Sequence, residues 1–179
     1  PINRRNYFDK IFSICSYSYL NELLSYNKIL KQRNSLLRTE KNTIKKQKEI
    51  EIWNKPLIQK GFSLWSKRKA MMNEFISFFI KTVNRFDKNL KLDIKYDLKS
   101  QNEEEYNIKL IEKTDSDIKK KHTSFGPHRD DVFFFWDQKQ IKNHGSQGEH
   151  KLFLALLKIT EQLFLSQKTQ KTPIILIDD

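Results

Sequence analysis

Residues 144–159, HGSQGEHKLFLALLKI, place a small polar triplet directly before an almost wholly apolar segment. Apolar residues spaced by threes and fours predict a helix over about residues 147–166. Ser146 is suited to cap this helix, and Gly148 would let a ligand approach the backbone closely. A helix N-terminus also favours an anion, because its first amides are unpaired and the helix dipole is positive there. The triplet, with Gln147 at its centre, therefore fits both an ordinary cap and a phosphate site. The residues predicted to bury the helix are Leu152, Ala155, Leu156, Ile159 and Leu163.

The chain closes with PIILIDD, residues 173–179. Its four consecutive aliphatic residues, 174–177, predict a strand that is buried on both faces of a parallel sheet. Asp178 and Asp179 follow at the carboxyl end, where open α/β sheets bind ligands. In nucleotide triphosphatases the first of two such acids holds Mg²⁺ and the second orients the attacking water. A buried strand that ends in an acidic turn is the simpler alternative.

The first half of the chain is predicted to be helical. Residues 3–38 suit two helices or one bent helix, and the polar segment 39–51 can continue as exposed helix. A long apolar stripe then runs from Ile58 to Phe86, with one gap between Trp65 and Met72 and with Pro56 near its start. Neighbouring amphipathic helices of this length predict an elongated helical arm.

The hydrophobic period changes at Leu90. Apolar and charged residues alternate over 90–99, which predicts a half-buried strand. A polar helix is expected over 101–119, and residues 132–141 predict a strand, a turn and a short second strand. The fold class is therefore mixed α/β and rich in helix.

The composition indicates a partner with negative charge. Lys and Arg outnumber Asp and Glu by 34 to 22, a formal charge of +12, which suits nucleic acid or nucleotide phosphate, although a biased genome composition gives the same excess. The single Cys15 and the absence of a membrane span or a secretory signal predict a cytoplasmic protein. A chain that begins with Pro1 and stops at Asp179 is expected to be an internal piece of a longer protein.

GPHRDD, residues 126–131, combines a turn-forming Gly-Pro with a dense set of charges. A metal site and a hydrogen-bonded turn whose charges pair with one another both fit this composition. The spacing matches no known ligand pattern, which favours the turn. The residues considered as metal ligands are His128, Asp130, Asp131, His144 and His150.

Taken in order, GPHRDD, SQG before a helix and an aliphatic strand with two acids resemble the C-terminal half of the RecF family. These proteins are bacterial recombination-mediator ATPases of the ABC and SMC-like class. RRNYFD at 4–9, QRNSLLR at 32–38 and WNKPLIQKG at 53–61 are similar to RecF segments that build its helical second lobe. The resemblance implies a mainly helical arm (lobe II) over 1–120, with a strand near 90–99. It also implies a partial ATPase core over 121–179, with the signature helix and the Walker B strand.

The resemblance also implies roles for particular residues. Ser146, Gln147 and Gly148 match the ABC signature motif, which binds the terminal phosphate of ATP held by the opposite subunit. Asp178 and Asp179 match the Walker B pair, with Asp178 at the metal and Asp179 in catalysis. The sequence departs from the family at Glu149 and His150, where RecF usually has two Gln residues.

For the whole protein, the resemblance implies ATP and Mg²⁺ as cofactors and a homodimer that forms on ATP binding. It further implies single-stranded, gapped or junction DNA as substrate and RecR and RecO as partners. No G-x-x-x-x-G-K-[ST] motif occurs in the chain, so we predict that these 179 residues alone neither bind ATP tightly nor hydrolyse it. Two alternatives are another SMC-like or overcoming-lysogenization-type ATPase and a non-enzymatic basic helical scaffold.

Overall fold

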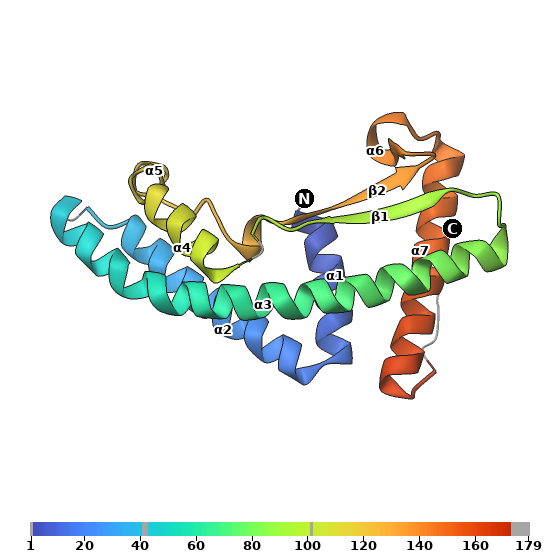
Figure 1. The fold of residues 1–179 in the computed structure, drawn as a ribbon, viewed down its shortest axis with the longest axis horizontal. Coiled ribbons are helices and arrows are strands. Elements are labelled where there is room, and N and C mark those ends of the chain that lie inside the picture. Colours follow the sequence, from blue (N-terminus) through green and yellow to red (C-terminus); the bar gives the residue numbers. More distant parts are fainter. Residues whose placement is uncertain (1, 41–42, 101, 173–179) are drawn as a thin grey trace. The chain divides into compact units, whose positions relative to one another are not determined.

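The computed structural model describes residues 2–40, 43–100 and 102–172 (Figure 1). It is rich in helix and has one small antiparallel sheet, which confirms the predicted class. The predicted final strand over 173–179, with Asp178 and Asp179, lies outside the described residues. The elements are α1 (Ile2–Cys15), α2 (Tyr17–Leu37), α3 (Thr43–Phe86), β1 (Leu92–Asp97), α4 (Glu103–Glu112), α5 (Thr114–Lys120), η1 (Pro127–Arg129), β2 (Asp131–Trp136), β3 (Lys139–Gln140), α6 (Ile141–His144) and α7 (Gln147–Thr169).

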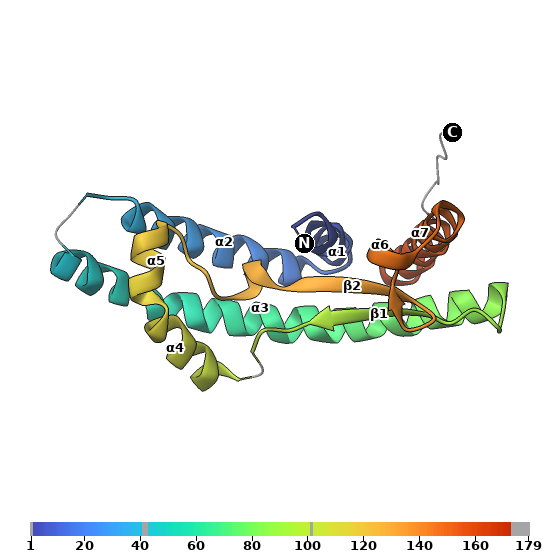
Figure 2. The same ribbon diagram turned by 90° about the horizontal axis from the view of Figure 1, so that it is seen from above.

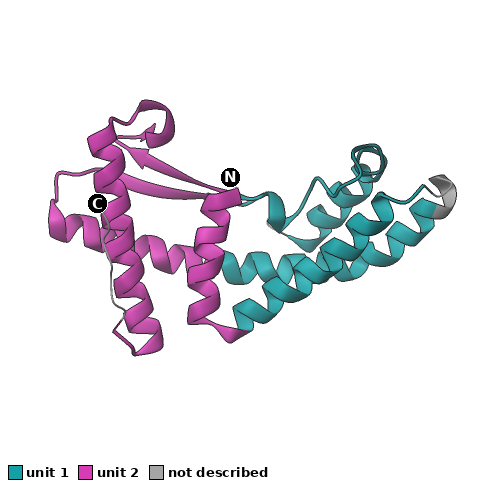
Figure 3. Cartoon of the chain, turned by 180° about the vertical axis from the view of Figure 1, so that it is seen from behind, with its two compact units in different colours: residues 1, 18–68, 98–130 teal, residues 2–17, 69–97, 131–179 magenta. Residues whose placement is uncertain are grey.

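The chain divides into two compact units, coloured separately in Figure 3. Unit 1 contains residues 18–68 and 98–130, and unit 2 contains residues 2–17, 69–97 and those from 131 onward. Helix α3 belongs to unit 1 as far as Arg68 and to unit 2 from Lys69. The division of the parent protein into an arm over 1–120 and an ATPase core from 121 stays a prediction.

Unit 1 is helical: α2, the first part of α3, α4 and α5 surround its core. Tyr19, Tyr26, Trp65 and Tyr106 are buried there, and the rings of Trp65 and Tyr106 lie 4.6 Å apart between centroids. Helix α4 begins at a cap in which the Asn102 side chain accepts from the Glu105 amide at 2.6 Å. The polar helix expected over 101–119 is thus two helices, α4 and α5, separated at Lys113.

Pro56 lies in the interior of α3 and not near its start, because the helix begins thirteen residues earlier at Thr43. The prediction placed the beginning of the helix too late. Proline cannot donate to the carbonyl of Ile52, four residues before it. Ile52 itself is 73% exposed, so water can reach this side of the helix and solvate the carbonyl.

The sheet of unit 2 follows the predicted alternation. β1 pairs antiparallel with β2, from Leu92 opposite Trp136 to Asp97 opposite Asp131, and β2 pairs with the short β3. Figures 1 and 2 show β1 and β2 side by side. α1, the second part of α3, and α7 supply an aromatic core in which the rings of Phe8 and Phe75 lie 5.2 Å apart. Its other members are Phe12, Phe79, Phe134, Phe153 and Phe164.

Helix α7 forms as predicted, but it buries a different face. Of the five residues expected to bury it only Leu156 is buried, and Ile159 and Leu163 are 43% and 46% exposed. Phe153 and Phe164 pack into the aromatic core and set the rotation of the helix about its axis. The buried residues are Phe153, Leu156, Leu157, Thr160, Phe164 and Leu165.

Within the described ranges, no helix has the length and apolar content needed to cross a membrane. Burial raises the pKa of the Cys15 thiol to about 11. The thiol therefore stays protonated at neutral pH and is a poor nucleophile.

Candidate nucleotide-binding site

The Ser-Gln-Gly triplet lies at the exposed N-terminus of α7. Ser146 is the N-cap, and its hydroxyl oxygen accepts from the Glu149 amide at 3.2 Å. In return the Ser146 amide donates to the Glu149 carboxylate at 2.6 Å, which completes a capping box. Gln147 and Gly148 are the first two residues of the helix, and both are exposed. The predicted cap is confirmed.

No contact among the described residues requires glycine at position 148. A Cβ built at this position meets no described atom within 4 Å, and the residue does not adopt a positive φ. Glycine in a helix costs roughly 0.5–1 kcal/mol relative to alanine. The open space beside the Gly148 backbone allows a ligand or a second chain to approach it closely, as the signature role requires.

Glu149 keeps a negative charge beside this helix end. The hydrogen bonds from the backbone and side chain of Ser146, with the nearby His150, lower the pKa of its carboxyl below the usual value. The carboxylate turns back towards the Ser146 amide. The Ser146 amide, which a bound phosphate would use, is therefore already occupied by Glu149. The negative charges of the phosphate and of the Glu149 carboxylate would also lie close together and repel one another.

The GPHRDD turn is hydrogen-bonded, as predicted, but its two aspartates pair with Arg68 and Arg4 outside the turn and not with charges inside it. Asp130 is fully buried in unit 1, where it accepts from Trp65 Nε1 at 2.7 Å and from Arg68 Nη1 at 3.0 Å. Arg68, which is 2% exposed, also donates to the Pro127 carbonyl at 2.9 Å and to the Tyr19 hydroxyl at 3.1 Å. The buried charge is thus paired within a hydrogen-bond network.

Asp131 belongs to unit 2, and its partner is Arg4. The Arg4 guanidinium donates to both carboxylate oxygens, from Nε at 3.1 Å and from Nη2 at 2.7 Å. Burial alone would raise the pKa of Asp131, but the Arg4 side chain and the Val132 amide hold it below its usual value. This two-point pairing fixes the start of β2 against α1.

Gly126 and His128 complete the turn in unit 1. Gly126 has φ +135°, and a Cβ there would lie 2.6 Å from the hydroxyl oxygens of both Tyr26 and Tyr106. His128 Nδ1 lies 2.6 Å from the Tyr26 hydroxyl, and its Nε2 lies 2.9 Å from the Thr123 carbonyl. Because only a protonated Nε2 can bond that carbonyl, Nδ1 accepts from Tyr26 in the neutral ring. Only glycine fits at position 126.

The two remaining histidines considered as metal ligands lie in unit 2. His144 lines a small cavity of about 170 Å³ beside Trp136 and Glu149, and the His150 amide donates to the Ser146 carbonyl. No group of three or more His, Cys, Asp or Glu residues among those described could hold a metal ion. Whether Asp178 and Asp179 lie near such a group falls outside the described residues.

Sequence reasoning missed the buried arginines. Arg68 occupies the gap in the apolar stripe between Trp65 and Met72, three residues after the one and four before the other. The spacing itself was the available signal. Arg33 is likewise fully buried, with Asn54, Asp117 and Thr123 as partners.

The sequence matches known proteins along its entire length, although no family model matches it. It is 34% identical over 182 residues to the DNA replication and repair protein RecF of Leptospira interrogans serogroup Icterohaemorrhagiae serovar Lai, with 100% of this chain and 48% of the relative covered. It is 35% identical over 182 residues to RecF of Lachnoclostridium phytofermentans, with 100% and 50% covered. The solved structure of the recombination mediator protein RecF-ATP in the RecFOR pathway has a TM-score of 0.88 at 28% identity, covering 100% of this chain and 50% of that one.

The chain belongs to the RecF family. It spans about half the length of the curated relatives it matches. RecF proteins are DNA replication and repair proteins, and the RecF-ATP and RecF-ATPrS structures both match this chain. Its fold is the corresponding part of the RecF ABC-type ATPase fold, which favours RecF over the other SMC-like ATPase and the scaffold.

Proposed function

We propose that the parent protein is an ATP-dependent DNA-binding recombination mediator, and that Ser146, Gln147 and Gly148 bind the terminal phosphate of ATP held by a second subunit. The observation that carries this proposal is the exposed triplet at the N-terminus of α7, in a chain that superposes on RecF-ATP with a TM-score of 0.88. ATP supplies the phosphates that join two subunits and, through its hydrolysis, the energy that separates them.

The groups that this chain offers to the phosphate are backbone amides and one hydroxyl. The Gly148 amide is at a helix N-terminus, where the dipole favours an anion. The Ser146 hydroxyl oxygen accepts from the Glu149 amide, and its hydrogen, which here is directed at the Glu149 carboxylate, would turn to a phosphate oxygen. The open space at Gly148 lets that oxygen come close to the backbone.

Further parts of the proposal rest on family resemblance and on charge. Asp178 would hold Mg²⁺ and Asp179 would orient the attacking water, in a core that begins near residue 121. Single-stranded, gapped or junction DNA is the proposed substrate, and RecR and RecO are the proposed partners. The net charge of +12 supports contacts with DNA phosphates, which position a protein without reading sequence.

The test is ATP-dependent dimerisation of the whole protein with Ser146→Arg. The arginine would fill the space that the phosphate needs, so we expect dimerisation measured by light scattering to be lost while binding of a fluorescent ATP analogue is retained. Gln167→Arg adds the same charge at an exposed position near the other end of α7 and should dimerise normally. Dimerisation of Ser146→Arg at wild-type ATP concentrations would overturn the role in the opposite subunit.

A further inference from the structure

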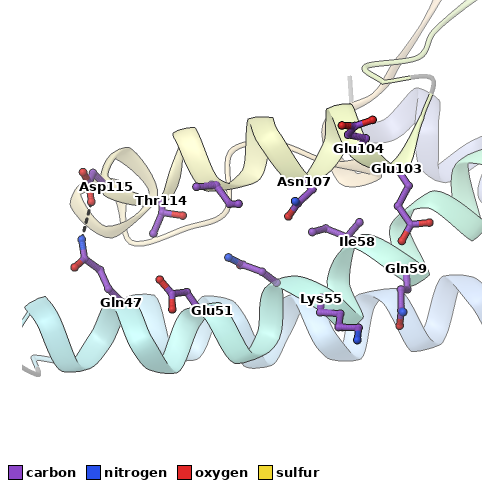
Figure 4. A pocket seen from close by; sticks show the side chains of 12 residues that line it. Gln47, Glu51, Lys55, Ile58, Gln59, Glu103, Glu104, Asn107, Thr114 and Asp115 are labelled. Atoms are coloured by element: carbon purple, nitrogen blue, oxygen red, sulfur yellow. Dashed lines mark hydrogen bonds between the residues drawn. The ribbon is translucent and has the colours of Figure 1, made fainter.

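Unit 1 contains a groove between the first part of α3 and the helices α4 and α5. Its volume is about 760 Å³, and none of its lining residues belongs to the Ser-Gln-Gly triplet or to the GPHRDD turn. Figure 4 shows the two walls facing one another, with Gln47 of α3 bonded to Asp115 of α5 at one end at 2.9 Å. A space of this size suits several side chains of a bound segment.

One buried side chain links α3 to α5 at this groove. The Arg33 guanidinium of α2 donates to Asn54 of α3 at 3.1 Å and to Asp117 of α5 at 2.8 Å. Both Arg33 and Asp117 have fully buried side chains, so α5 cannot move without breaking a buried ion pair, and α3 cannot move without breaking the bond to Asn54. The groove is therefore preformed, which lowers the entropic cost of binding.

The groove is acidic although the chain as a whole is basic. Glu51 of α3 and Glu103 of α4 extend from facing walls in Figure 4, and Glu104 and Asp115 also line it. Lys55 is the one cation among the lining residues, and in Figure 4 it extends away from α4. Acidic residues in the first turns of α4 and α5 also stabilise those helices through the helix dipole. Glu51 is in the interior of α3 and has no such role.

Apolar surface lies beside these charges. Ile58 and Ile111 line the groove, but only Ile111, which is 57% exposed, offers apolar surface, because Ile58 is 5% exposed and packs into the core. Ile108, one turn before Ile111 on α4, is 50% exposed. Exposed isoleucines next to carboxylates match the two faces of a basic amphipathic helix, which binds by laying its apolar face into a groove.

We propose that this groove is a docking site for a lysine- or arginine-rich amphipathic segment of a partner protein. The apolar face of that segment contacts Ile111, and its cations pair with Glu51 and Glu103. The same carboxylates repel DNA phosphates, so the groove binds protein and not nucleic acid. The site is independent of the nucleotide role proposed for Ser146–Gly148.

The test uses the 179-residue chain and a fluorescent 18-residue peptide that carries leucines along one helical face and lysines along the other. We expect fluorescence anisotropy to show binding, and Glu51→Lys with Glu103→Lys to weaken it at least tenfold. Glu40→Lys with Glu112→Lys makes the same charge change at exposed positions of unit 1 outside the groove, and it should weaken binding less than twofold. Ile111→Ser should also weaken binding, whereas Ile14→Ser, at an exposed position of unit 2, should not.

Three results would overturn the proposal. Equal loss in the two charge-reversed variants would mean attraction to the net charge alone. Equal binding of a peptide with the same composition and no apolar stripe would mean that apolar contact with the groove does not contribute to binding. Oligomers of the wild-type chain that Glu51→Lys with Glu103→Lys dissociates would identify a second copy as the occupant. Circular dichroism of each variant verifies that unit 1 remains folded.

Discussion

Replacing Gly148 by alanine should have opposite effects on stability and on assembly. Inside the chain the new methyl group enters open space, since a Cβ at this position meets no described atom within 4 Å. The gain is the helix preference of alanine over glycine, which is about 0.5–1 kcal/mol in a helix interior and at most that in the first turn, where residue 148 lies. For a chain of this size that corresponds to a rise in the melting temperature of roughly 1–4 °C.

Assembly should respond in the other direction. If an ATP phosphate on a second subunit approaches the Gly148 amide, the methyl group occupies part of the space that it needs. We expect at least a tenfold higher ATP concentration for half-maximal dimerisation of the whole protein, together with the higher melting temperature of the free chain. Gln167→Ala, an exposed change in the same helix, should leave dimerisation unaltered.

Thermal unfolding by circular dichroism and dimerisation by light scattering measure the two effects separately. A fall in melting temperature would show that the space around Gly148 is not open. A rise in melting temperature with wild-type dimerisation would refute the close approach of a phosphate.

Three further variants test the charges. Asp130→Ala leaves the Arg68 guanidinium buried without this carboxylate and should lower the free energy of unfolding by about 3–5 kcal/mol in urea titrations; a loss under 1 kcal/mol would contradict the buried pair. Arg4→Ala should destabilise the chain at neutral pH, and because the folded-state pKa of Asp131 lies below its ordinary value of 3.8, the difference from wild type should shrink as the pH falls below that value. A difference that stays constant down to pH 2 would count against this pairing. Glu149→Gln keeps a side chain that can close the capping box and removes the negative charge, so the whole protein should dimerise at lower ATP concentrations; an unchanged requirement would mean that the carboxylate does not face the phosphate.

For α7, local sequence signals predicted where the helix begins better than which face it buries. Helix α7 begins at Gln147 because Ser146 caps it, and both facts could be predicted from a few neighbouring residues. The face that α7 buries could not be predicted in this way, because Leu154, Ile159 and Leu163 make the segment apolar all round. Tertiary packing of Phe153 against Phe79 and Phe134 made that choice.

The candidate site shows the same limit. The sequence placed the Ser-Gln-Gly triplet on a helix N-terminus, and the structure adds that it is exposed and that Glu149 closes a capping box there. Its phosphate role stays a prediction, since the groups that would share it belong to a second subunit. The groove at α3 could not be foreseen, because its walls are separated by about fifty residues of sequence.

The Arg33 side chain has a consequence for biosynthesis. Its ion-pair partner Asp117 is 84 residues further along the chain, so α2 and α3 emerge from the ribosome well before the carboxylate that pairs with Arg33. At about 5–20 residues per second, that interval lasts roughly 4–17 s. During this time the Arg33 guanidinium, which is buried in the folded protein, is exposed to water beside apolar surface that is not yet covered. The helical unit therefore completes its folding late, and chaperones have a defined period in which to bind it.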